Sequence, residues 1–536
     1  MNENLKSRKM RGGYYTPREL TQFIANWGIE YGDEYILEPS AGEGRFVDSA
    51  FRILKAKNKD VTDTQILAVE IDREESKKIS TKQSKVVNED FFHYYENELK
   101  TDRRFDIVIG NPPFIRYQTV DKKVGERAFK IMEDSGLHPN KMTNLWVPFL
   151  VASVNLLKSS GKLGMVIPAE LLQVDYAAEI RKFLLENFEE LNIIAINKQL
   201  FEDAQQEVVL ILAKKKSINQ GFKFIEIDRI TDLSKNLLYE KGGRITNPEK
   251  NKDKWLKYFL KSSEFEIYEK YVNSNLFRSF ESIAEVNVGV VTGQNKFFVL
   301  SKKDRENNSL KESSFIDIIS RADQIRGIFL NQEKLEALYE DNKKVSLFYP
   351  EKKLSTEERK YISYGEGEGY NRGYKTRIRK EWYRVPISWI PEGFFLRQVH
   401  EFPKIVVNRT RATNTDTLHK VRMKDGFDIE NLALSFLNSF TLLHAELSGR
   451  SYGGGVLTFE PGEVRSLKIP YHNFTKAQKE HLFQLIETSR IQDAIRKIDE
   501  IVLEKNLSID RKDIDGFKAS WKKLSQRRLN RKNKKV

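Results

Sequence analysis

Short apolar segments alternate with helical stretches over the first 245 residues of this chain. Short runs rich in β-branched and aliphatic residues are typical of buried strands, and their alternation with helices predicts an α/β fold with a parallel sheet covered on both faces. In open sheets of this kind, ligands bind beyond the carboxyl ends of the strands. The predicted strands are Tyr35–Glu38, Ile66–Glu70, Lys85–Asn88, Asp106–Gly110, Lys162–Pro168, Leu191–Asn197 and Glu207–Lys214. The predicted helices include Arg18–Tyr31, Arg45–Lys55, Asn144–Leu157 and Ala177–Asn187.

The composition of the sequence changes after this region. A polar, linker-like stretch comes first, and irregular strands with many aromatic residues and glycines follow it. An amphipathic pattern over Thr475–Leu503 predicts a helix, and we expect the basic tail from Lys518 to be disordered when free. These changes divide the chain into a first domain, a linker or helical connection, a mixed α+β domain and a helical, basic end, at residues 1–245, 246–284, 285–470 and 471–536.

The charge balance is basic. Formal net charge is +14, although Asp and Glu together number 77. This combination indicates a globular protein rather than a disordered polycation, and nucleic acid is the default polyanionic partner. Charge alone leaves two alternatives open, an anionic membrane surface and simple solubility.

The chain has no cysteine, which excludes disulfides, Cys-ligated zinc and a thiol nucleophile. Methylation of a cytosine ring carbon requires thiolate attack and is therefore excluded. His93, His138 and His400 lack the spacing of a metal site, so we expect no bound metal. No segment approaches the ~20 apolar residues of a membrane span, and no signal-like segment follows the N-terminus. We expect a cytoplasmic protein with no membrane partner.

Asn111-Pro112-Pro113-Phe114 follows a predicted strand and carries the clearest chemical signal. The Asn111 side chain and the Pro112 carbonyl can accept two hydrogens from one exocyclic amino group, and Phe114 offers a ring for stacking a flat base. The prolines stiffen the turn because they fix φ and restrict the preceding residue. The alternative interpretation is a strand that simply ends in a proline turn.

Acidic residues follow the first three predicted strands. Glu38 begins a loop in which Gly42 and Gly44 allow close approach of a ligand to the backbone. Val47 occupies the third glycine position of a dinucleotide fingerprint, so a pyrophosphate site is not indicated. Glu70 could accept hydrogen bonds from ribose hydroxyls. Asp90 could accept the amino group of a cofactor adenine between Ile71 and Phe91, although each acid could instead be a helix N-cap or a surface residue.

Taken together, these motifs resemble the TaqI-like group of S-adenosylmethionine-dependent DNA amino-methyltransferases, which have the gamma-class motif order. Gly13-Tyr14-Tyr15-Thr16-Pro17 is similar to the N-terminal motif of that group, which precedes the glycine motif. The resemblance implies a Rossmann-like methyltransferase sheet, a DNA target-recognition domain and S-adenosylmethionine as cofactor. The cofactor-binding residues that it implies are Tyr15, Thr16, Glu38, Ala41, Gly42, Gly44, Glu70, Ile71, Asp90, Phe91 and Asn111.

Two later segments extend the resemblance. Phe201, before the strand at Glu207–Lys214, is similar to a late motif that supplies a second aromatic ring to the target base, although Phe201 could equally belong to the core. Val286–Leu300 resembles the opening of a C-terminal specificity domain.

The resemblance implies methyl transfer to the N6 amino group of an adenine. The target atom is buried in a duplex, so the base must flip out, and stacking on Phe114 would offset part of the unstacking energy. Catalysis would depend on positioning by Asn111 and Pro112 rather than on a strong base.

Basic and aromatic residues mix in several segments of the later domain. Arg377 and Arg411, from residues 374–384 and 408–411, are the candidate DNA contacts, and a similar mixture occurs at 450–455. Each segment could instead be a solvated face. We expect double-stranded DNA as partner, a monomer, and a cognate restriction endonuclease that acts separately.

Other functions of the same fold stay open on sequence grounds. These are methylation of cytosine N4, RNA or a protein glutamine, and a non-catalytic DNA-binding regulator. The large C-terminal region argues against the smaller RNA- and protein-modifying relatives, and the intact Asn111–Phe114 motif argues against the regulator.

Overall fold

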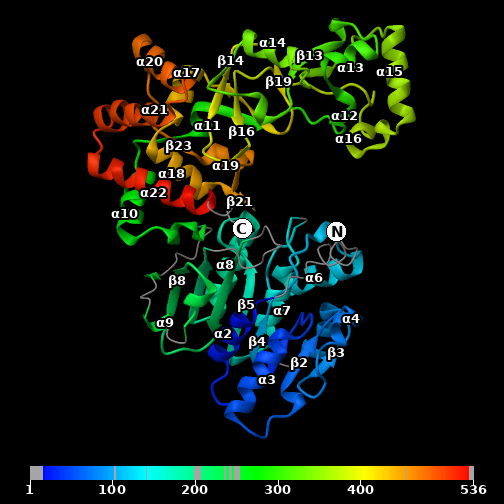
Figure 1. Cartoon of the computed structure of the whole chain (residues 1–536), viewed down its shortest axis with the longest axis vertical. Coiled ribbons are helices and arrows are strands. Elements are labelled where there is room, and N and C mark those ends of the chain that lie inside the picture. The colour runs from blue at the N-terminus through cyan, green and yellow to red at the C-terminus, as the bar shows by residue number, and fades with distance from the viewer. Residues whose placement is uncertain are drawn as a thin grey trace. The chain divides into compact units, whose positions relative to one another are not determined.

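The computed structural model describes residues 16–101, 104–140, 142–197, 207–234, 237–240, 244–246, 254–452 and 454–529. The chain forms two compact units that meet in sequence between Phe259 and Leu260. We describe each unit by itself (Figure 1). Tyr15 and Phe201 lie outside the described residues.

The first unit is built on a nine-stranded sheet with the order β3-β2-β1-β4-β5-β7-β6-β8-β9. The strands β1 to β5 run parallel, as predicted. The rest of the sheet is mixed, because β7 lies antiparallel between β5 and β6, and β9 is antiparallel to β8. The alternation of apolar runs could not show this, since a strand buried on both faces has the same composition in either direction. The strands are β1 (Ile36–Glu38), β2 (Ile66–Val69), β3 (Lys85–Val87), β4 (Phe105–Gly110), β5 (Leu157–Pro168), β6 (Glu190–Ile196), β7 (Val208–Lys214), β8 (Gly221–Ile227) and β9 (Arg244–Thr246).

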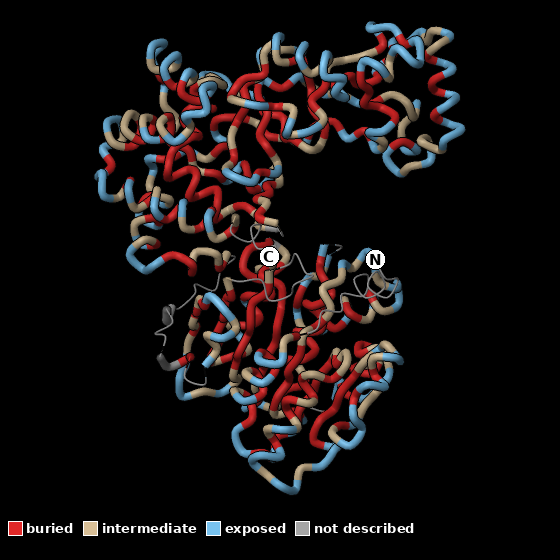
Figure 2. Tube along the Cα trace, viewed as in Figure 1, coloured by how far each residue is buried: buried red, intermediate tan, exposed pale blue. Residues whose placement is uncertain are grey.

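Helices cover this sheet, and most of its residues are buried (Figure 2). The amphipathic helices α2 and α3 place residues such as Ile24 and Phe46 in one cluster with Ile107 and Ile109 of β4. The helix α7 is buried along almost its whole length against β4 and β5. The four helices named from the sequence are all present, with ends that differ by a few residues. The helices of this unit are α2 (Arg18–Gly28), α3 (Arg45–Lys57), α4 (Arg73–Ser76), α5 (Phe91–Tyr94), α6 (Lys122–Asp134), α7 (Trp146–Leu156), α8 (Ala178–Asn187) and α9 (Leu237–Glu240).

The second unit combines small sheets with helices, as the mixed α+β pattern predicts. Its five-stranded sheet has the order β11-β20-β16-β18-β14, and its four-stranded sheet has the order β12-β15-β13-β19. The strands of these sheets are β11 (Ala284–Val288), β12 (Val299–Leu300), β13 (Phe315–Ile319), β14 (Phe329–Leu330), β15 (Ser346–Phe348), β16 (Gly393–Leu396), β18 (Ile405–Asn408), β19 (Thr413–Asn414) and β20 (Leu418–Met423). The helices used below are α12 (Asn295–Phe298), α15 (Thr356–Gly367), α16 (Tyr374–Arg377), α17 (Ile429–Phe436), α18 (Ser439–Ser448), α20 (Lys476–Glu487), α21 (Ile491–Ile498) and α22 (Arg511–Leu529).

Two expectations for the C-terminal region are wrong. The helix expected over Thr475–Leu503 is broken between α20 and α21, where Ser489 adopts the left-handed conformation with φ of +61°. The tail expected to be disordered from Lys518 is the helix α22 as far as Leu529. Net charge misled the second prediction, because this helix also presents a buried stripe of residues including Phe517 to the unit.

None of the helices in the described part of the chain is long and apolar enough to cross a bilayer. The described residues also hold no group of three or more His, Asp or Glu side chains that could bind a metal ion.

Candidate active site

Four of the predicted motifs meet at one edge of the first unit's sheet. The strands β3, β2, β1 and β4 are neighbours and run parallel, so their carboxyl ends lie side by side. Glu38 ends β1, Glu70 and Asn111 directly follow β2 and β4, and Asp90 follows β3 after a short turn. The strand order reverses between β1 and β4, and this reversal is where open α/β sheets form their ligand crevice.

The glycine loop between β1 and α3 is fixed by its backbone and by Glu70. Gly42 and Gly44 both adopt left-handed conformations, with φ of +55° and +84°. The Gly42 N–H donates to Glu70 Oε2 over 2.7 Å, and the N–H of Asp72 donates to Glu70 Oε1 over 2.8 Å. A Cβ atom added at Gly42 would meet no atom within 4 Å, so this side of the loop is open to a ligand.

Glu38 is a buried acid beneath this loop. Its side chain accepts a hydrogen bond from the backbone of Val47, yet its Oε2 atom has no hydrogen-bond partner among the described residues. Burial, and then repulsion by the Glu70 carboxylate, raise the pKa of Glu38 well above its usual range. A buried acceptor of this kind suits a ligand that brings a hydrogen-bond donor or a positive charge.

Asp90 caps the helix α5 and also lies at the edge of the sheet where the other predicted site residues meet. Its Oδ1 atom accepts a hydrogen bond of 2.9 Å from the N–H of His93 and thereby caps α5, as the N-cap alternative proposes. Burial raises the pKa of Asp90. Ile71 is 63% exposed and is available as an apolar wall. The ring of Phe91 is buried and stacks on Phe149 with 5.2 Å between centroids, and its role as an apolar wall of the cofactor site stays a prediction.

The Asn111 turn is linked to the start of α2. Asn111 Nδ2 donates to Thr16 Oγ1 over 3.2 Å, which directs the side-chain oxygen of Asn111 away from Thr16. Ser40 Oγ donates to the backbone carbonyl of Asn111 over 3.3 Å. Arg45 donates to the backbone carbonyl of Thr16 over 3.1 Å. The N-terminal motif, the glycine loop and the Asn-Pro-Pro-Phe motif are therefore one hydrogen-bonded group.

Two of these contacts were not predicted from the sequence. Ser40 lies inside the glycine loop, so its position was a usable signal. Arg45, the first residue of α3, gives no such signal, because its partner lies 29 positions earlier in the chain.

The segment after Asn111 is anchored on both sides. Pro112 is buried, and the half-buried Phe114 packs against the core cluster of the first unit. Ile115 accepts a backbone hydrogen bond of 2.8 Å from Leu145, next to α7. These contacts fix the position of Phe114 before any substrate is present.

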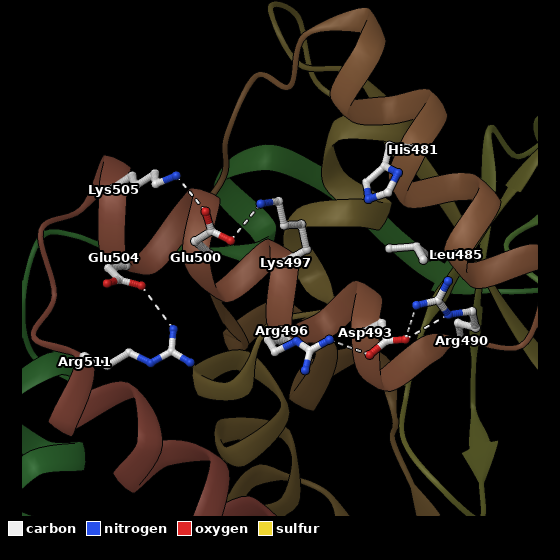
Figure 3. A pocket seen from close by; sticks show the side chains of 10 residues that line it. All are labelled: His481, Leu485, Arg490, Asp493, Arg496, Lys497, Glu500, Glu504, Lys505 and Arg511. Carbon is white, nitrogen blue, oxygen red and sulfur yellow. Dashed lines mark hydrogen bonds and ion pairs between the residues drawn. The ribbon is translucent and has the colours of Figure 1, made fainter.

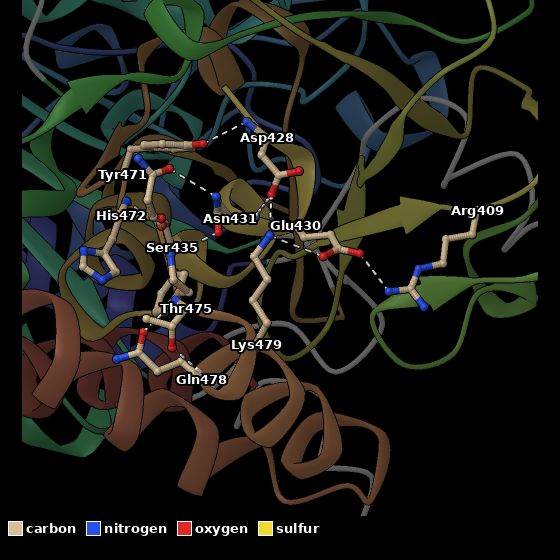
Figure 4. A network of polar contacts seen from close by, with 12 residues as sticks. Arg409, Asp428, Glu430, Asn431, Ser435, Tyr471, His472, Thr475, Gln478 and Lys479 are labelled. Atoms are coloured by element: carbon tan, nitrogen blue, oxygen red, sulfur yellow. Dashed lines mark hydrogen bonds and ion pairs between the residues drawn. The ribbon is translucent and has the colours of Figure 1, made fainter. Parts of the chain in front are cut away.

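Some arginines in the basic segments of the second unit form ion pairs within that unit. Arg409 lies 3.6 Å from the ring centre of Phe329 and pairs with Glu430 over 2.8 Å, at the end of a polar network that continues through Lys479 to Asp428 (Figure 4). Arg450 pairs with the buried Glu463. The predicted contacts Arg377 and Arg411 are exposed.

A cavity of about 450 Å³ lies among α20, α21, the π-helical segment Asp499–Asn506 and α22 in the second unit (Figure 3). Its charged side chains pair with one another, and hydrogen bonds from Lys497 and Lys505 lower the pKa of Glu500 to about 2. None of the predicted site residues lines this cavity. Ion pairs among the lining residues explain why so many of them are charged. The lining residues are His481, Leu485, Arg490, Asp493, Arg496, Lys497, Glu500, Glu504, Lys505 and Arg511.

Two protein families match the chain. The model described as N-6 DNA Methylase matches residues 1–281, which is more than half of the sequence. The model described as the C-terminal domain of Type II methyltransferase M.Eco57I matches residues 252–503.

Individual relatives extend this similarity. The chain is 25% identical to Type II methyltransferase M.AccI of Acinetobacter calcoaceticus, over 94% of this chain and 95% of that protein. It is 23% identical to Type II methyltransferase M.BanIII of Aneurinibacillus aneurinilyticus, over 56% of this chain and 60% of that protein. The solved structure of the Type IIL restriction-modification enzyme MmeI in complex with DNA has a similar fold, with a TM-score of 0.61 and 10% identity over 95% of this chain and 75% of that one.

Proposed function

Because the chain belongs to the N-6 DNA methylase family, we propose that it is a site-specific methyltransferase that modifies the N6 amino group of an adenine in duplex DNA. The observation that carries the proposal is the hydrogen bond between Asn111 and Thr16, which joins the turn of the predicted catalytic motif to the N-terminal motif. Relatives named Type II methyltransferases support a role in a restriction-modification system.

S-adenosylmethionine fits the residues beyond β1, β2 and β3. The Glu70 carboxylate accepts backbone hydrogen bonds from Gly42 and Asp72, and as an acceptor it would also bind ribose hydroxyls. Among the described residues, the Oε2 atom of Glu38 has no hydrogen-bond partner. This oxygen suits a ligand that carries ammonium and sulfonium groups. Ile71 and Asp90 would hold the adenine, and Thr16 the methionine end. When bound, the cofactor supplies an electrophilic methyl group.

Asn111 and Pro112 would position the nucleophile. An adenine amino nitrogen is a poor nucleophile because its lone pair is delocalised into the ring. The Asn111 side-chain oxygen and the Pro112 carbonyl would accept its two hydrogens, which favours a pyramidal nitrogen with a directed lone pair. Such catalysis relies on positioning and preorganised dipoles. It needs no strong base, since the methylated nitrogen loses its proton readily.

The target adenine must leave the duplex to reach this turn. Phe114 offers the stacking surface at the end of β4, and its packing against the core holds its ring in place. Arg377 and Arg411, both exposed in the second unit, are proposed contacts to the DNA. Phe201 stays a prediction as a second stacking residue.

The direct test incubates the full chain with unmodified bacterial DNA and S-adenosylmethionine labelled on its methyl group. We expect label in N6-methyladenine at one short sequence, located by sequencing the modified bases. Label in N4-methylcytosine would replace the proposed base, and label found only in a parallel reaction with bacterial RNA would replace DNA as the substrate. The Asn111→Ala variant is the matched control, because it should bind the cofactor and transfer label about 10²–10³ times more slowly.

A further inference from the structure

The single helical turn α16 carries two large apolar side chains into solvent. Tyr374 is 67% exposed and Ile378, directly after the turn, is 60% exposed. Residues four apart lie on the same face of a helical turn, so the two side chains are neighbours. On the opposite side, Thr376 is fully buried. The turn therefore separates a packed inner side from an apolar outer side.

The turn is held rigidly from inside. Thr376 Oγ1 donates to the carbonyls of Tyr370 and Gly373, each over 2.9 Å. Arg379 donates from one nitrogen to the carbonyls of Val291 and Thr292, over 2.8 and 2.9 Å. Because these bonds fix the turn in advance, a partner that contacts Tyr374 and Ile378 need not order the backbone.

A close approach of two segments adds to this rigidity. Gly293 adopts a left-handed conformation with φ of +80°, and a Cβ atom added there would lie 2.8 Å from Cβ of Lys375. The backbone of the loop before α12 therefore packs directly against the Lys375 side chain of the turn α16. Only glycine at position 293 allows this contact without a shift.

The stretch around the apolar pair carries only positive charge. Residues 369–380 contain five Lys and Arg residues and no acid. Glu366 and Glu381, which flank the stretch, bond to Trp382 Nε1 and to Arg384 respectively, and the exposed Glu368 lies directly before it. Four of the five cations are exposed, namely Arg372, Lys375, Arg377 and Lys380.

We propose that Tyr374 and Ile378 form an apolar wedge that contacts the base pairs of duplex DNA in a groove, while the exposed cations beside them hold phosphates. Duplex DNA is the partner that these features fit, because it presents anionic phosphates around apolar base edges and thymine methyl groups. Apolar side chains that press against or between base steps are an established way to bind and deform a duplex. This inference rests on the proposed DNA methyltransferase function and names the residues that read its substrate.

The wedge makes a prediction that separates it from ordinary charge attraction. Tyr374→Ser with Ile378→Ser removes apolar surface but no positive charge. We therefore expect about a tenfold or larger loss of affinity for a duplex that carries the recognition site, because an aromatic contact to a base typically contributes this much to binding. The slope of log affinity against log salt should stay unchanged, because every cation that neutralises a phosphate is kept.

Two further variants complete the comparison. Lys375→Ala with Arg377→Ala should weaken binding to site-bearing and random duplexes alike and reduce the salt slope by about 0.9 for each phosphate that is no longer neutralised. Ile218→Ser, which removes an isoleucine that is 98% exposed in the first unit, should change nothing. Unfolding temperatures of all variants show whether each is folded, and we expect no change because the altered side chains are exposed.

The measurement is fluorescence anisotropy with the full chain and two duplexes of equal length, one with the site found by sequencing and one of random sequence. The inference is supported if the Tyr374 and Ile378 variant loses affinity for the site-bearing duplex only. Wild-type DNA affinity in that variant overturns the inference. If size-exclusion chromatography then shows a dimer for the wild type and a monomer for the variant, the patch is a contact between copies of the chain. Methyl transfer by the wild-type chain is recorded in parallel. If the chain transfers no methyl group, the proposed function is refuted, and the wedge is then tested on a duplex selected by its binding to the chain from a pool of random sequences.

Discussion

The carboxylate of Glu70 bonds to the backbone N–H of Gly42, which lies 28 residues earlier in the chain, over 2.7 Å. This bond joins the end of β2 to the open glycine loop after β1. Glu70 therefore has two tasks in the proposed site, since it orders the loop and offers acceptor capacity to a ribose.

Replacing Glu70 separates these two tasks. Glu70→Ala should weaken S-adenosylmethionine binding about 10- to 150-fold, the effect of losing a charged hydrogen bond of about 1.5–3 kcal/mol. Glu70→Gln keeps one side-chain oxygen for the loop and should bind with an intermediate affinity. Titration calorimetry measures both. Equal affinity in the alanine variant and the wild type would place Glu70 outside the cofactor site.

Exposed and paired arginines should differ in their effect on DNA binding. Arg377→Ala and Arg411→Ala should each reduce affinity for duplex DNA while cofactor binding is unchanged, with relaxed sequence preference if the residue contacts a base and a smaller salt slope if it contacts phosphate. Arg409→Ala is the matched comparison, because it removes an arginine that pairs with Glu430. It should lower the unfolding temperature rather than change the salt slope. Wild-type DNA affinity in both exposed variants would favour the solvated-face interpretation.

The strand ends were predictable from the sequence because they depend on local pattern. Apolar runs that end in Glu38, Glu70 and Asn111 show both the strand and the polar group that follows it, and parallel strands bring such groups together. The direction of β7 was not predictable, since a buried strand reads the same in both directions.

Roles that depend on distant partners were also beyond the sequence. The stacking of Phe91 on Phe149, for example, is a contact between residues 58 positions apart. Arg409 and Arg411 look equivalent in sequence and both are exposed, and only the structure shows that Arg409 pairs with Glu430. The helix α22 was not predicted, because its many Lys and Arg residues outnumber its widely spaced apolar residues.

The second unit should depend on Arg528, near the end of α22. Arg528 is 2% exposed and forms two hydrogen bonds with the buried Glu446, over 2.7 and 3.0 Å. Removing one partner leaves the other charge buried, which typically costs 3–5 kcal/mol. Arg528→Ala should therefore lower the free energy of unfolding by about 3–5 kcal/mol in urea. Lys522→Ala, at an exposed position of the same helix, should have little effect, and an equal effect of both variants would contradict the role of the pair.

The stability of the second unit should also depend on pH through Asp499. Asp499 accepts hydrogen bonds from the backbone and side chain of Ser439 at the start of α18, near Lys518 and Arg511, and burial raises its pKa from 3.8 to about 6. The folded state therefore holds a proton that the unfolded chain releases between about pH 4 and 6. The free energy of unfolding should fall by about 3 kcal/mol as pH rises through this window, at about 1.4 kcal/mol per pKa unit.

The Asp499→Asn variant tests this dependence. It keeps an acceptor for the Ser439 N–H but cannot ionise, so its stability should not fall across this pH range and should exceed that of the wild type at pH 8. Unfolding temperatures at pH 4 and pH 8 give the comparison. Asp425→Asn, which changes an exposed acid, should retain the wild-type dependence. The same slope in wild type and Asp499→Asn would assign the pH dependence to other groups.

The firmest expectation concerns Asn111 itself. Asn111→Ala removes the side-chain acceptor proposed for the target amino group and leaves the glycine loop and Glu70 untouched. Cofactor affinity should survive while single-turnover methyl transfer falls by about 10²–10³, the usual effect of removing a preorganised polar group at a reacting centre. Phe114→Ala should give a smaller defect that is partly relieved when the target adenine lies opposite an abasic site, because such a base is easier to flip. Asn219→Ala, in an exposed turn of the first unit, controls for the removal of an asparagine side chain. Methyl transfer near the wild-type rate by Asn111→Ala would remove the basis of the proposed mechanism, since the bond between Asn111 and Thr16 would then serve only the fold.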